Sequence, residues 1–545
     1  MMNETSNFIK TIVQNDIESG KVKNVITRFP PEPNAYLHIG HARAIITDFE
    51  IAEAFNGETN LRFDDTNPAK EDEEFVDAII NDIEWLGYHP KKICYGSDYF
   101  DTKYEMAIRL IKKGLAYVDE QTPEEIVANR GNFNESGKNS PWRDRSIEEN
   151  LELFENMKNG MYKEGEKVLR AKIDMSSPNI NMRDPILYRI LFMHHHRQKD
   201  KWCIYPMYDF AHPLQDSIEG VTHSLCSIEF ENHRPLYDWV VKECEMEHVP
   251  QQIEFGRLNI ENTVLSKRYL RELVSLGFVE GYDDPRMPTL VGLKRRGYTP
   301  SAIKNFVKAS GLSKVNSTIS LSMLEHFVRE DLKLKAKRIM AVTNPLLLII
   351  DNYEEGKVEY VEAINNQENP ELGERLMAFS KYLYINKDDF ILEKPNKKWK
   401  RLALNVEVRL MYAYFIKAVS VDYDEDGNIE AVHCTYDPET KSGSGFDIRK
   451  PNGTLTFVEK TTAKKALFNI FEPLFIEGSE GKDFKDRINH NSWYTYEGYV
   501  EKAKDEFNEL ESFQFIRDGY YTVDKNSNND NLIFNQTVAL KSSFK

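Results

Sequence analysis

A strand, a turn and a helix near the amino end constrain the fold more than any other part of the sequence. Residues 24–29 (NVITRF) have the β-branched and aromatic content of a strand, and the PPEPN turn that follows breaks any helix. From Leu37, apolar residues recur at helical spacing (LHIGHARAIITDFEIAEAF) and predict a helix. The chain therefore predicts a strand that turns sharply into a helix within about ten residues.

A second unit of the same kind follows directly. Residues 60–65 (NLRFDD) predict another strand, and Asn67 and Pro68 supply a cap and a first helical position for residues 70–87. Strand–helix–strand–helix order predicts a parallel, doubly wound sheet, which binds ligands at the carboxyl ends of its strands. Asp64 and Asp65 stand at such an end, where a carboxylate would suit an ammonium group; a pair of solvated loop acids is the alternative.

Two histidines stand where the first helix is predicted to begin. His38 and His41 are three residues apart, so both lie on one face of the first turn, beside backbone N–H groups without a helical acceptor. Such a helix start attracts polyphosphate, and Gly40 lets a bulky ligand approach the backbone. The usual GxGxxG is absent, and a histidine pair here could also be a cap. Alone, this motif predicts only nucleotide binding.

Composition narrows the class of protein. A chain of 545 residues exceeds one core and suggests roughly three to five domains. The hydrophobic fraction of 41% and charged fraction of 29% are typical of a soluble protein. The longest apolar run, residues 345–350, is far shorter than a membrane span, and MMNETSNFIK has no signal-peptide pattern. We therefore expect a cytoplasmic protein without a membrane partner.

Cysteine and histidine patterns predict no dedicated protein metal site. The five cysteines form no CxxC pair, which argues against a zinc ribbon and a disulfide scaffold. HHH at residues 194–196 has no acidic or thiol partner at ligand spacing, so an exposed or RNA-facing helix is preferred there.

The net charge of −17 would ordinarily count against nucleic acid as a partner, but basic residues are clustered. The clusters are residues 294–296 (KRR), 333–338 (KLKAKR) and 397–401 (KKWKR), and Trp399 in the last could stack on a base. Three basic patches on an acidic chain would fit a long RNA held at several points. Solvated surface faces are the alternative.

The pattern changes along the rest of the chain. From about Asp98 it predicts helices with a polar loop at 131–145 and a capping box from Ser146 to Glu149, which together look inserted. The remaining predicted elements are strands at 201–210, 222–230 and 253–260 that complete the sheet, helices at 301–311 and 320–332, and a hairpin of 408–423 with 429–436 around DEDGN. Short strands and turns to Lys545 predict β-barrels.

Six motifs in one order give a specific resemblance. RFPPEPNAYLHIGH, RFDDTNP, CIYPMYDFAHP, THSLCSIEF, VLSKR and DDPRMPTL resemble the glutaminyl-tRNA synthetases of bacterial type. The resemblance covers nearly the whole chain and is densest to about residue 340. It implies an α/β multidomain fold: a class I Rossmann catalytic domain with an inserted acceptor-binding domain, a helical subdomain and two C-terminal anticodon-binding β-barrels.

The implied domains follow the changes of pattern. They are an N-terminal helical extension (1–24), the first Rossmann half (25–97), the acceptor-end-binding insertion (98–207), the second Rossmann half (208–260), a helical subdomain with the VLSKR loop (261–338) and two barrels (339–545). A monomer is the family's expectation.

The implied reaction activates L-glutamine with ATP and transfers it to the terminal adenosine 2'-hydroxyl of the glutamine tRNA. Glutamine's own carboxylate attacks the α-phosphate, so the enzyme needs positioned charge and no protein nucleophile. His38 and His41 would contact the phosphates, and Lys267 would close a loop over the pyrophosphate with substrate-bound Mg2+. The resemblance adds to the ATP site Glu32, Pro33, Asn34, Ile39, Gly40, Ala42, Arg43, Ala44, Ser227, Arg257, Leu258, Leu265 and Ser266.

The resemblance also assigns the other two substrates. For glutamine, it implies that Asp64 holds the α-ammonium group and Tyr208 bonds the side-chain amide, with Arg28 nearby. For the tRNA, the positions near the anticodon bases are Arg338, Arg401, Gln514 and Arg517.

Departures from the family pattern also make predictions. VLSKR keeps only Ser266 and Lys267 of the general class I motif. Ala35 replaces a glycine expected after PPEPN, so we predict a negative φ there, because a positive φ would strain alanine.

Three alternatives stay open. A glutamyl-tRNA synthetase shares the fold and reaction, but PPEPN is the glutaminyl pattern, and Cys226 stands where glutamyl enzymes tend to carry arginine, the natural partner of a γ-carboxylate. A small-molecule nucleotidyltransferase has no use for the barrels. A non-catalytic RNA-binding paralogue could lose His38, His41, Asp64 and Lys267, all of which are present.

Overall fold

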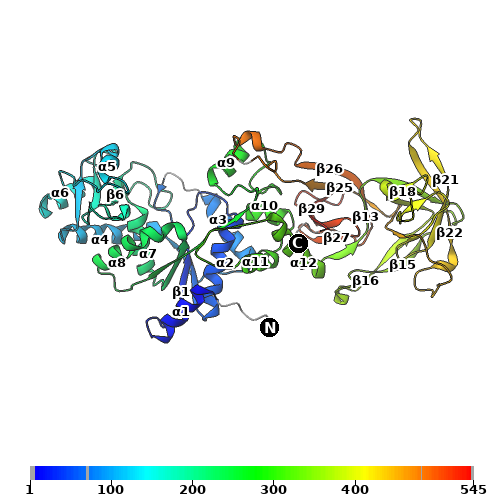
Figure 1. Ribbon diagram of the computed structural model, residues 1–545, viewed down its shortest axis with the longest axis horizontal. Helices are drawn as coiled ribbons and strands as arrows, with labels where there is room; N and C mark the ends of the chain where they lie inside the picture. The colour runs from blue at the N-terminus through cyan, green and yellow to red at the C-terminus, as the bar shows by residue number, and fades with distance from the viewer. Residues whose placement is uncertain (1–6, 69–72, 480, 542–545) are drawn as a thin grey trace. The chain divides into compact units, whose positions relative to one another are not determined.

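The structure is a computed structural model that describes residues 7–68, 73–479 and 481–541 (Figure 1). The chain divides into two compact units. The first unit holds residues 1–259 and 307–319, and the second holds residues 260–306 and 320–545. Each unit is described by itself below. The helices of the described residues are too short or too polar to cross a membrane.

A parallel sheet forms the centre of the first unit. Strands β1 (Ile26–Phe29), β2 (Glu58–Phe63) and β3 (Ile93–Tyr95) pair in parallel, and so do β8 (His223–Ser227) and β9 (Gln251–Phe255). A backbone hydrogen bond of 2.9 Å from Thr222 to Ile26 joins the start of β8 to β1. The predicted doubly wound sheet is therefore confirmed.

Helix α2 (Ile39–Ala54) follows β1, and α3 (Glu73–Trp85) follows β2. Apolar residues of α2 are buried against the sheet, Ile45, Ile46 and Phe49 among them. The chain returns from α2 to β2 through Gly57. Only glycine fits there, because a Cβ would lie 2.2 Å from the Val25 carbonyl oxygen. Residues 69–72 are not described, so the predicted start of α3 lies outside the described residues.

The inserted segment contains an antiparallel sheet, of which the sequence predicted only the strand at 201–210 and assigned it to the parallel sheet. Helices α4 (Phe100–Lys112), α5 (Pro123–Arg130) and α6 (Ile147–Lys158) alternate with the antiparallel sheet β4 (Ala116–Asp119), β5 (Val168–Ala171), β6 (Ile186–Ile190) and β7 (Ile204–Pro206). The expectation of helices with a polar loop was thus incomplete, because strands this short carry too few residues for a clear period of two. Ser146 caps α6 as predicted, accepting the Glu149 N–H at 3.1 Å.

Two predicted strands were too long. Residues 208–210 begin α7 (Tyr208–Ile218), and β8 ends at Ser227, where a 3-10 helix (Ile228–His233) leads into α8 (Arg234–Glu243). Aromatic residues suggested strand in both places, but Phe210 and Leu214 of α7 are buried in the core at helical spacing. Strand β10 (Leu258–Ile260) pairs with β11 (Ser317–Ile319) instead of extending β9.

Helices and two curved sheets make up the second unit. Its helical part includes α9 (Lys267–Ser275), α10 (Leu290–Arg295) and α12 (Leu321–Lys335), while α11 (Pro300–Ala309) lies across the division between units. Over the described residues, one sheet contains β12 (Lys337–Ile339), β13 (Ala341–Val342), β25 (Lys464–Phe471), β26 (Trp493–Val500), β27 (Ser512–Phe515), β28 (Gly519–Val523) and β29 (Leu532–Ala539).

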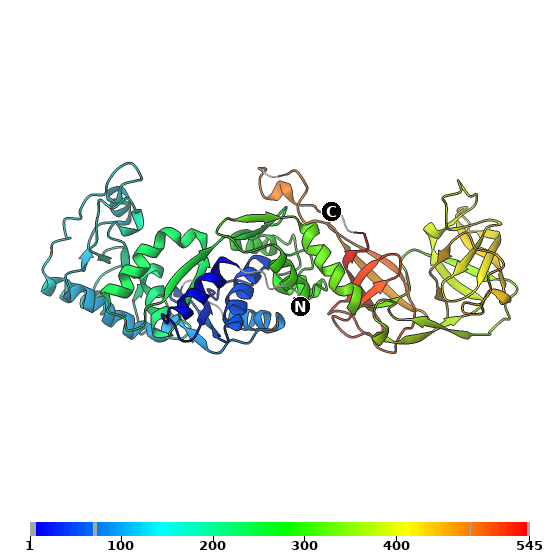
Figure 2. The same cartoon turned by 60° about the horizontal axis from the view of Figure 1, so that its bottom comes forward.

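The other sheet contains β14 (Pro345–Ile350), β17 (Tyr382–Asn386), β20 (Glu407–Leu410), β21 (Phe415–Tyr423), β22 (Ile429–Asp437), β23 (Thr454–Leu455) and β24 (Val458–Glu459). Strands β15 (Glu359–Ile364) and β16 (Glu374–Phe379) form a separate hairpin, and β18 (Phe390–Ile391) pairs with β19 (Leu402–Ala403). Each large sheet curves around its own hydrophobic core (Figure 2). The predicted hairpin around DEDGN is confirmed as β21 with β22.

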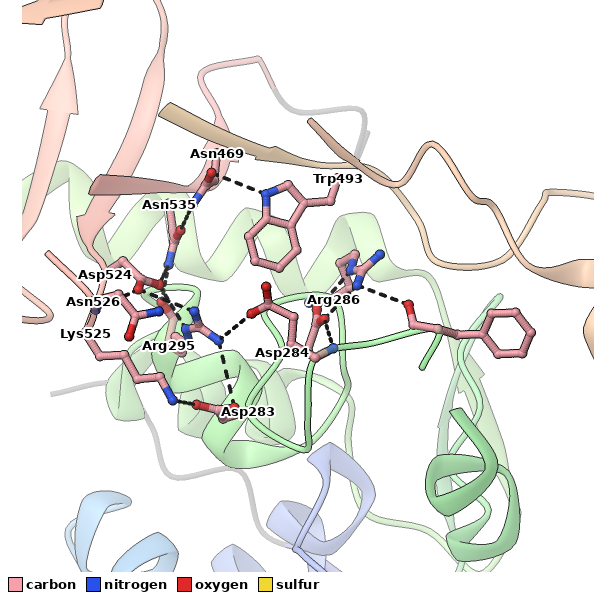
Figure 3. Close-up of polar contacts among 12 residues, drawn as sticks. Asp283, Asp284, Arg286, Arg295, Asn469, Trp493, Asp524, Lys525, Asn526 and Asn535 are labelled. Atoms are coloured by element: carbon pink, nitrogen blue, oxygen red, sulfur yellow. Dashed lines mark hydrogen bonds and ion pairs between the residues drawn. The ribbon is translucent and has the colours of Figure 1, made fainter. Parts of the chain in front are cut away.

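A polar cluster joins the helices of the second unit to the β25–β29 sheet (Figure 3). Asp284 and Arg286 of the DDPRMPTL motif form an ion pair of 2.6 Å, and Arg286 also bonds the Ser492 hydroxyl at 3.0 Å. Arg295 pairs with Asp524 at 2.9 Å, and both side chains are buried. The RNA interpretation of residues 294–296 is therefore wrong for Arg295, which holds two parts of the protein together.

Candidate active site

The predicted helix start is built by its two histidines. His38 is the cap of α2, so the helix begins at Ile39, two residues later than Leu37. His38 Nδ1 accepts the Gly40 N–H at 3.1 Å, and His41 Nδ1 accepts the His38 N–H at 3.1 Å. The two rings stack with their centroids 3.7 Å apart. The sequence left helix capping and phosphate binding as alternatives for His38 and His41. The geometry is compatible with both roles.

The caps determine which ring nitrogen carries the proton. A neutral imidazole has one acceptor and one donor nitrogen, so an Nδ1 that accepts a hydrogen bond leaves the proton on Nε2. His38 and His41 thus each present an Nε2–H donor while their Nδ1 atoms hold the first turn. This arrangement suits the oxygen atoms of a polyphosphate.

A pocket of about 190 Å³ gathers predicted residues from three segments of the first unit. The PPEPN turn, the end of β2 and the junction of β7 with α7 all contribute. The lining residues are Glu32, Pro33, Asn34, Asp64, Thr66, Asn67, Arg189, Pro206, Met207 and Tyr208. Ala35, next to the turn, does not have a positive φ, so that prediction is confirmed.

The two adjacent carboxylates have separate roles. Asp64 lines the pocket and accepts the Thr66 hydroxyl at 2.9 Å, while Asp65 is fully buried and accepts the backbone N–H and hydroxyl of Ser97 at 2.7 and 2.6 Å. Burial raises the pKa of Asp64, and the nearby Lys103 ammonium acts against that rise. Neither is a solvated loop acid; Asp64 can receive a cation, and Asp65 fixes the loop after β3.

Lys103 is a buried lysine that sequence reasoning missed. It lies on α4, donates to the Gly96 carbonyl at 2.8 Å and has no exposed surface. Burial lowers its pKa to about 7, and the Asp64 and Asp65 carboxylates oppose that change. In its protonated form, Lys103 therefore balances part of the negative charge of Asp64 and Asp65.

Tyr208 stands at the start of α7 with its ring held on both sides. Its ring stacks on His212 at 4.9 Å and contacts Phe230 at 5.2 Å. Burial raises the pKa of Tyr208, so the hydroxyl stays protonated and can both donate and accept a hydrogen bond. These are the properties needed to bind an amide.

Arg28, which the resemblance places near the glutamine, does not itself line the pocket. Its guanidinium is fully buried and bonds Asp216, the Leu225 carbonyl, the Ser224 hydroxyl and His212 at 2.6 to 3.3 Å. Through His212, which also contacts Tyr208, Arg28 supports the pocket from behind. Burial alone would raise the pKa of Asp216, but Arg28, His212 and Arg62 together hold it well below its usual range.

Cys226 is half-buried at the carboxyl end of β8, one residue before Ser227. Burial raises the pKa of its thiol, so Cys226 carries no charge at neutral pH. The position therefore supplies no cation that would attract a γ-carboxylate.

The sequence suggested that the histidine run at 194–196 is a helix without an acidic partner. The structure contradicts both points. Asp65 lies 3.9 Å from His195 and 3.8 Å from His196, a grouping with the composition of a metal site. Yet His195 Nε2 bonds the Asp65 carbonyl at 2.7 Å, and its Nδ1 accepts the Arg197 and Gln198 N–H groups. Both nitrogens are committed to the backbone, so we assign His195 a structural role.

The side chains of several predicted ATP-binding residues contact other residues of the protein. Arg43 is buried and donates to the Gly311 carbonyl at 2.7 Å, and Arg257 forms an ion pair with Glu229. Leu258 is buried, so only its backbone could reach a ligand. Leu265, Ser266 and Lys267 belong to the second unit, where Lys267 is the first residue of α9.

The four predicted anticodon residues fall into two pairs in the second unit. Arg338 and Gln514 are register partners on the parallel strands β12 and β27. Arg401 and Arg517 both reach Asp389, at 3.4 and 3.0 Å. Arg401 also lies over the ring of Trp399, at 5.5 Å from its centroid. Residues that are distant in sequence are thus brought together.

Comparison with known proteins identifies the family. The model of the class I (E and Q) tRNA synthetase catalytic domain matches residues 24–334, and the models of the anti-codon binding domains match residues 336–437 and 454–524. The glutamine–tRNA ligase of Clostridium perfringens is 56% identical, with 99% of each chain covered. Those of Clostridioides difficile (54%, all of both chains) and Vibrio cholerae (50%, 99% of this chain and 98% of the other) agree.

The chain belongs to the glutamine–tRNA ligases, a family of class I tRNA synthetases. The resemblance in the sequence and the alternation of strands and helices are both confirmed by this assignment. It is an enzyme, which rules out the non-catalytic paralogue, and its two anti-codon binding domains rule out the small-molecule nucleotidyltransferase.

Some residues of this ligase's pocket carried no individual signal. Thr66, Asn67, Pro206 and Met207 stand within recognised motifs, so the motifs could have supplied them. Arg189 lies on β6 of the insertion and donates to the Asn67 side chain at 3.1 Å. Because these two residues are 122 positions apart, only the folded chain shows that they meet.

Proposed function

We propose that the chain joins L-glutamine to its tRNA in two steps at the pocket of the first unit. The observation that carries the proposal is that the PPEPN turn, Asp64 and Tyr208 line one pocket. Asp64 offers a carboxylate to the α-ammonium group, Tyr208 offers a hydroxyl to the side-chain amide, and the capped start of α2 offers N–H donors to ATP.

In the first step, the glutamine carboxylate attacks the α-phosphorus of ATP. A new P–O bond forms, the bond to the β-phosphate oxygen breaks, and the electron pair leaves with pyrophosphate, giving glutaminyl-adenylate. His38 and His41 would donate hydrogen bonds to phosphate oxygens, and Lys267 would balance charge on the pyrophosphate. Mg2+ carried by the ATP phosphates would add further neutralisation.

In the second step, the 2'-hydroxyl of the terminal adenosine attacks the activated carbonyl. The C–O ester bond forms, the bond to AMP breaks, and the hydroxyl proton is lost to a phosphate oxygen or water. The protein's contribution is position: Asp64 and Tyr208 would hold the two ends of the glutamine so that its carbonyl faces the hydroxyl.

An aminoacylation assay tests this proposal. Glutamine and glutamate are each offered with glutamine tRNA and with glutamate tRNA, in the presence of ATP and Mg2+. We expect product only from glutamine with its own tRNA. Charging of glutamate would instead support the glutamyl-tRNA synthetase alternative, which shares the fold and the reaction.

Cys226 is proposed as a determinant of the choice between glutamine and glutamate. Replacing it with arginine adds a cation where a γ-carboxylate would be attracted, so we expect Cys226→Arg to shift the ratio of kcat/KM from glutamine towards glutamate by roughly tenfold or more. Cys226→Ser, which adds no charge, is the control. An unchanged ratio in Cys226→Arg would refute the assignment.

Arg401 is proposed to contact the tRNA near its anticodon. Arg401→Ala should raise the tRNA KM by roughly five- to fiftyfold, because one charged contact to the RNA is lost. The KM for ATP should stay constant, since Arg401 lies in the second unit, directly before β19, and does not line the pocket of the first unit. A change confined to the ATP KM would count against it.

We also propose that the chain works as a monomer in the cytoplasm, as its family resemblance implies. Basic and acidic residues form many ion pairs within each unit, and these pairs give no information about a second copy of the chain. Light scattering during size-exclusion chromatography tests the oligomeric state, and a dimer mass would overturn it.

A further inference from the structure

A second pocket, of about 330 Å³, lies on the second unit beside the Arg338–Gln514 pair. It is lined by His326, Arg329, Glu330, Lys333, Arg338, Glu368, Gln514, Tyr520 and Leu540. Two polar atoms of its lining, Arg338 Nε and Gln514 Oε1, are buried and have no hydrogen-bond partner in the described part of the chain. Buried polar atoms without partners are rare, so they indicate a ligand or ordered water at this place.

One acidic side chain pairs with two of the cations that line this pocket. Glu368 lies 2.8 Å from Arg338 Nη2 and 3.1 Å from Lys333 Nζ. Hydrogen bonds from Arg338 and then Lys333 lower the pKa of Glu368, so it stays ionised at neutral pH. Thus both nearby cations already have an anion as a partner.

The loop that carries Glu368 is anchored in place. The Asn366 side chain donates to the carbonyls of Lys333 and Ala336 at the end of α12, and it accepts the Glu368 N–H at 2.9 Å. Asn369 donates to the Leu334 carbonyl at 2.9 Å. The carboxylate is therefore held against Arg338 by the backbone, and its position does not depend on a flexible surface side chain alone.

We propose that Glu368 is a specificity-determining residue for tRNA selection, acting as an internal competitor that only a cognate RNA displaces from Arg338 and Lys333. The proposal rests on the proposed function and on the family resemblance, which places Arg338 and Gln514 near the anticodon bases. A base that satisfies Arg338 Nε and Gln514 Oε1 recovers the cost of displacing Glu368, whose charge is then hydrated. A base that cannot satisfy these atoms leaves the carboxylate in place and is repelled by it, so the competitor widens the gap between cognate and non-cognate tRNA.

Asp389 is a permanent partner of its arginines, in contrast to Glu368. It also bridges two predicted anticodon arginines, Arg401 and Arg517, but its side chain is only 6% exposed, whereas that of Glu368 is 38% exposed. An RNA could displace Glu368 into solvent, where its charge is hydrated, but displacing Asp389 would leave a buried charge unpaired. Asp389 therefore positions its arginines, and Glu368 competes for its own.

The variant Glu368→Gln tests the proposal, since it keeps the shape of the side chain and removes its charge. We expect the KM for glutamine tRNA to fall roughly three- to tenfold, because one repulsive charge leaves an RNA site. The kcat/KM for glutamate tRNA should rise by a larger factor, so discrimination between the two tRNAs falls. Dissociation constants measured by fluorescence anisotropy should fall for both tRNAs, and by a larger factor for glutamate tRNA than for glutamine tRNA.

Glu371→Gln is the matched control, because Glu371 lies three residues along the same loop and no ion pair is recorded for it within the described residues. It should leave the KM for both tRNAs unchanged. A higher KM for glutamine tRNA in Glu368→Gln would overturn the proposal, since it would mean that the carboxylate reads a base; so would an unchanged discrimination ratio. If the wild-type chain fails to charge glutamine at all, the proposed function fails instead.

Discussion

Replacing Lys267 with alanine is expected to lower kcat for glutamine-dependent ATP–pyrophosphate exchange by roughly a thousandfold. Negative charge builds on the departing pyrophosphate, and Lys267 is the cation that the family resemblance assigns to it. As the first residue of α9, it also stands among backbone N–H groups at the positive end of a helix. The exchange is measured with tRNA present, so that all substrates of the enzyme are available.

Arg271→Ala supplies the control for Lys267, because Arg271 is an exposed cation one turn further along α9. It should change kcat less than twofold. The transfer of glutamine from preformed adenylate to tRNA should be nearly normal in Lys267→Ala, because pyrophosphate has already left. Equal loss in both steps would mean that Lys267 supports the fold or the tRNA and not the leaving group.

Motifs predicted the parts of the site that lie close in sequence. The strand, the PPEPN turn and the helix start needed only local preferences, and the pocket contains Glu32, Asn34, Asp64 and Tyr208 from the recognised segments. The error at the helix start was two residues, since an imidazole can cap a helix in place of the usual short polar side chains.

Contacts between distant residues could not be predicted in the same way. Arg295 belongs to a basic run, but its partner Asp524 lies 229 positions away and turns it into an internal ion pair. Arg28 bonds Asp216 from 188 positions away, which places it behind the pocket. A single sequence gives the charge of such residues but not the side chain that each will meet.

Asp64→Asn is expected to lower kcat/KM for glutamine about a hundredfold, mainly through KM, with ATP KM changed less than threefold. Asparagine has the same shape but lacks the charge that would pair with the α-ammonium group. The side chain bonds only Thr66 within the protein, among the contacts recorded for the described residues, so the fold should remain intact. An unchanged melting temperature checks this point.

The pH dependence of this variant separates binding from structure. Burial raises the pKa of Asp64, while Lys103, Thr66 and Arg62 act against the rise. In the wild type, the KM for glutamine should therefore increase as pH falls through that raised pKa, because a protonated carboxyl group cannot pair with an ammonium group. Asparagine has no such proton, so the increase should vanish in Asp64→Asn. If the KM of both proteins rises equally at low pH, another group controls it, and Asp64 does not hold the ammonium group.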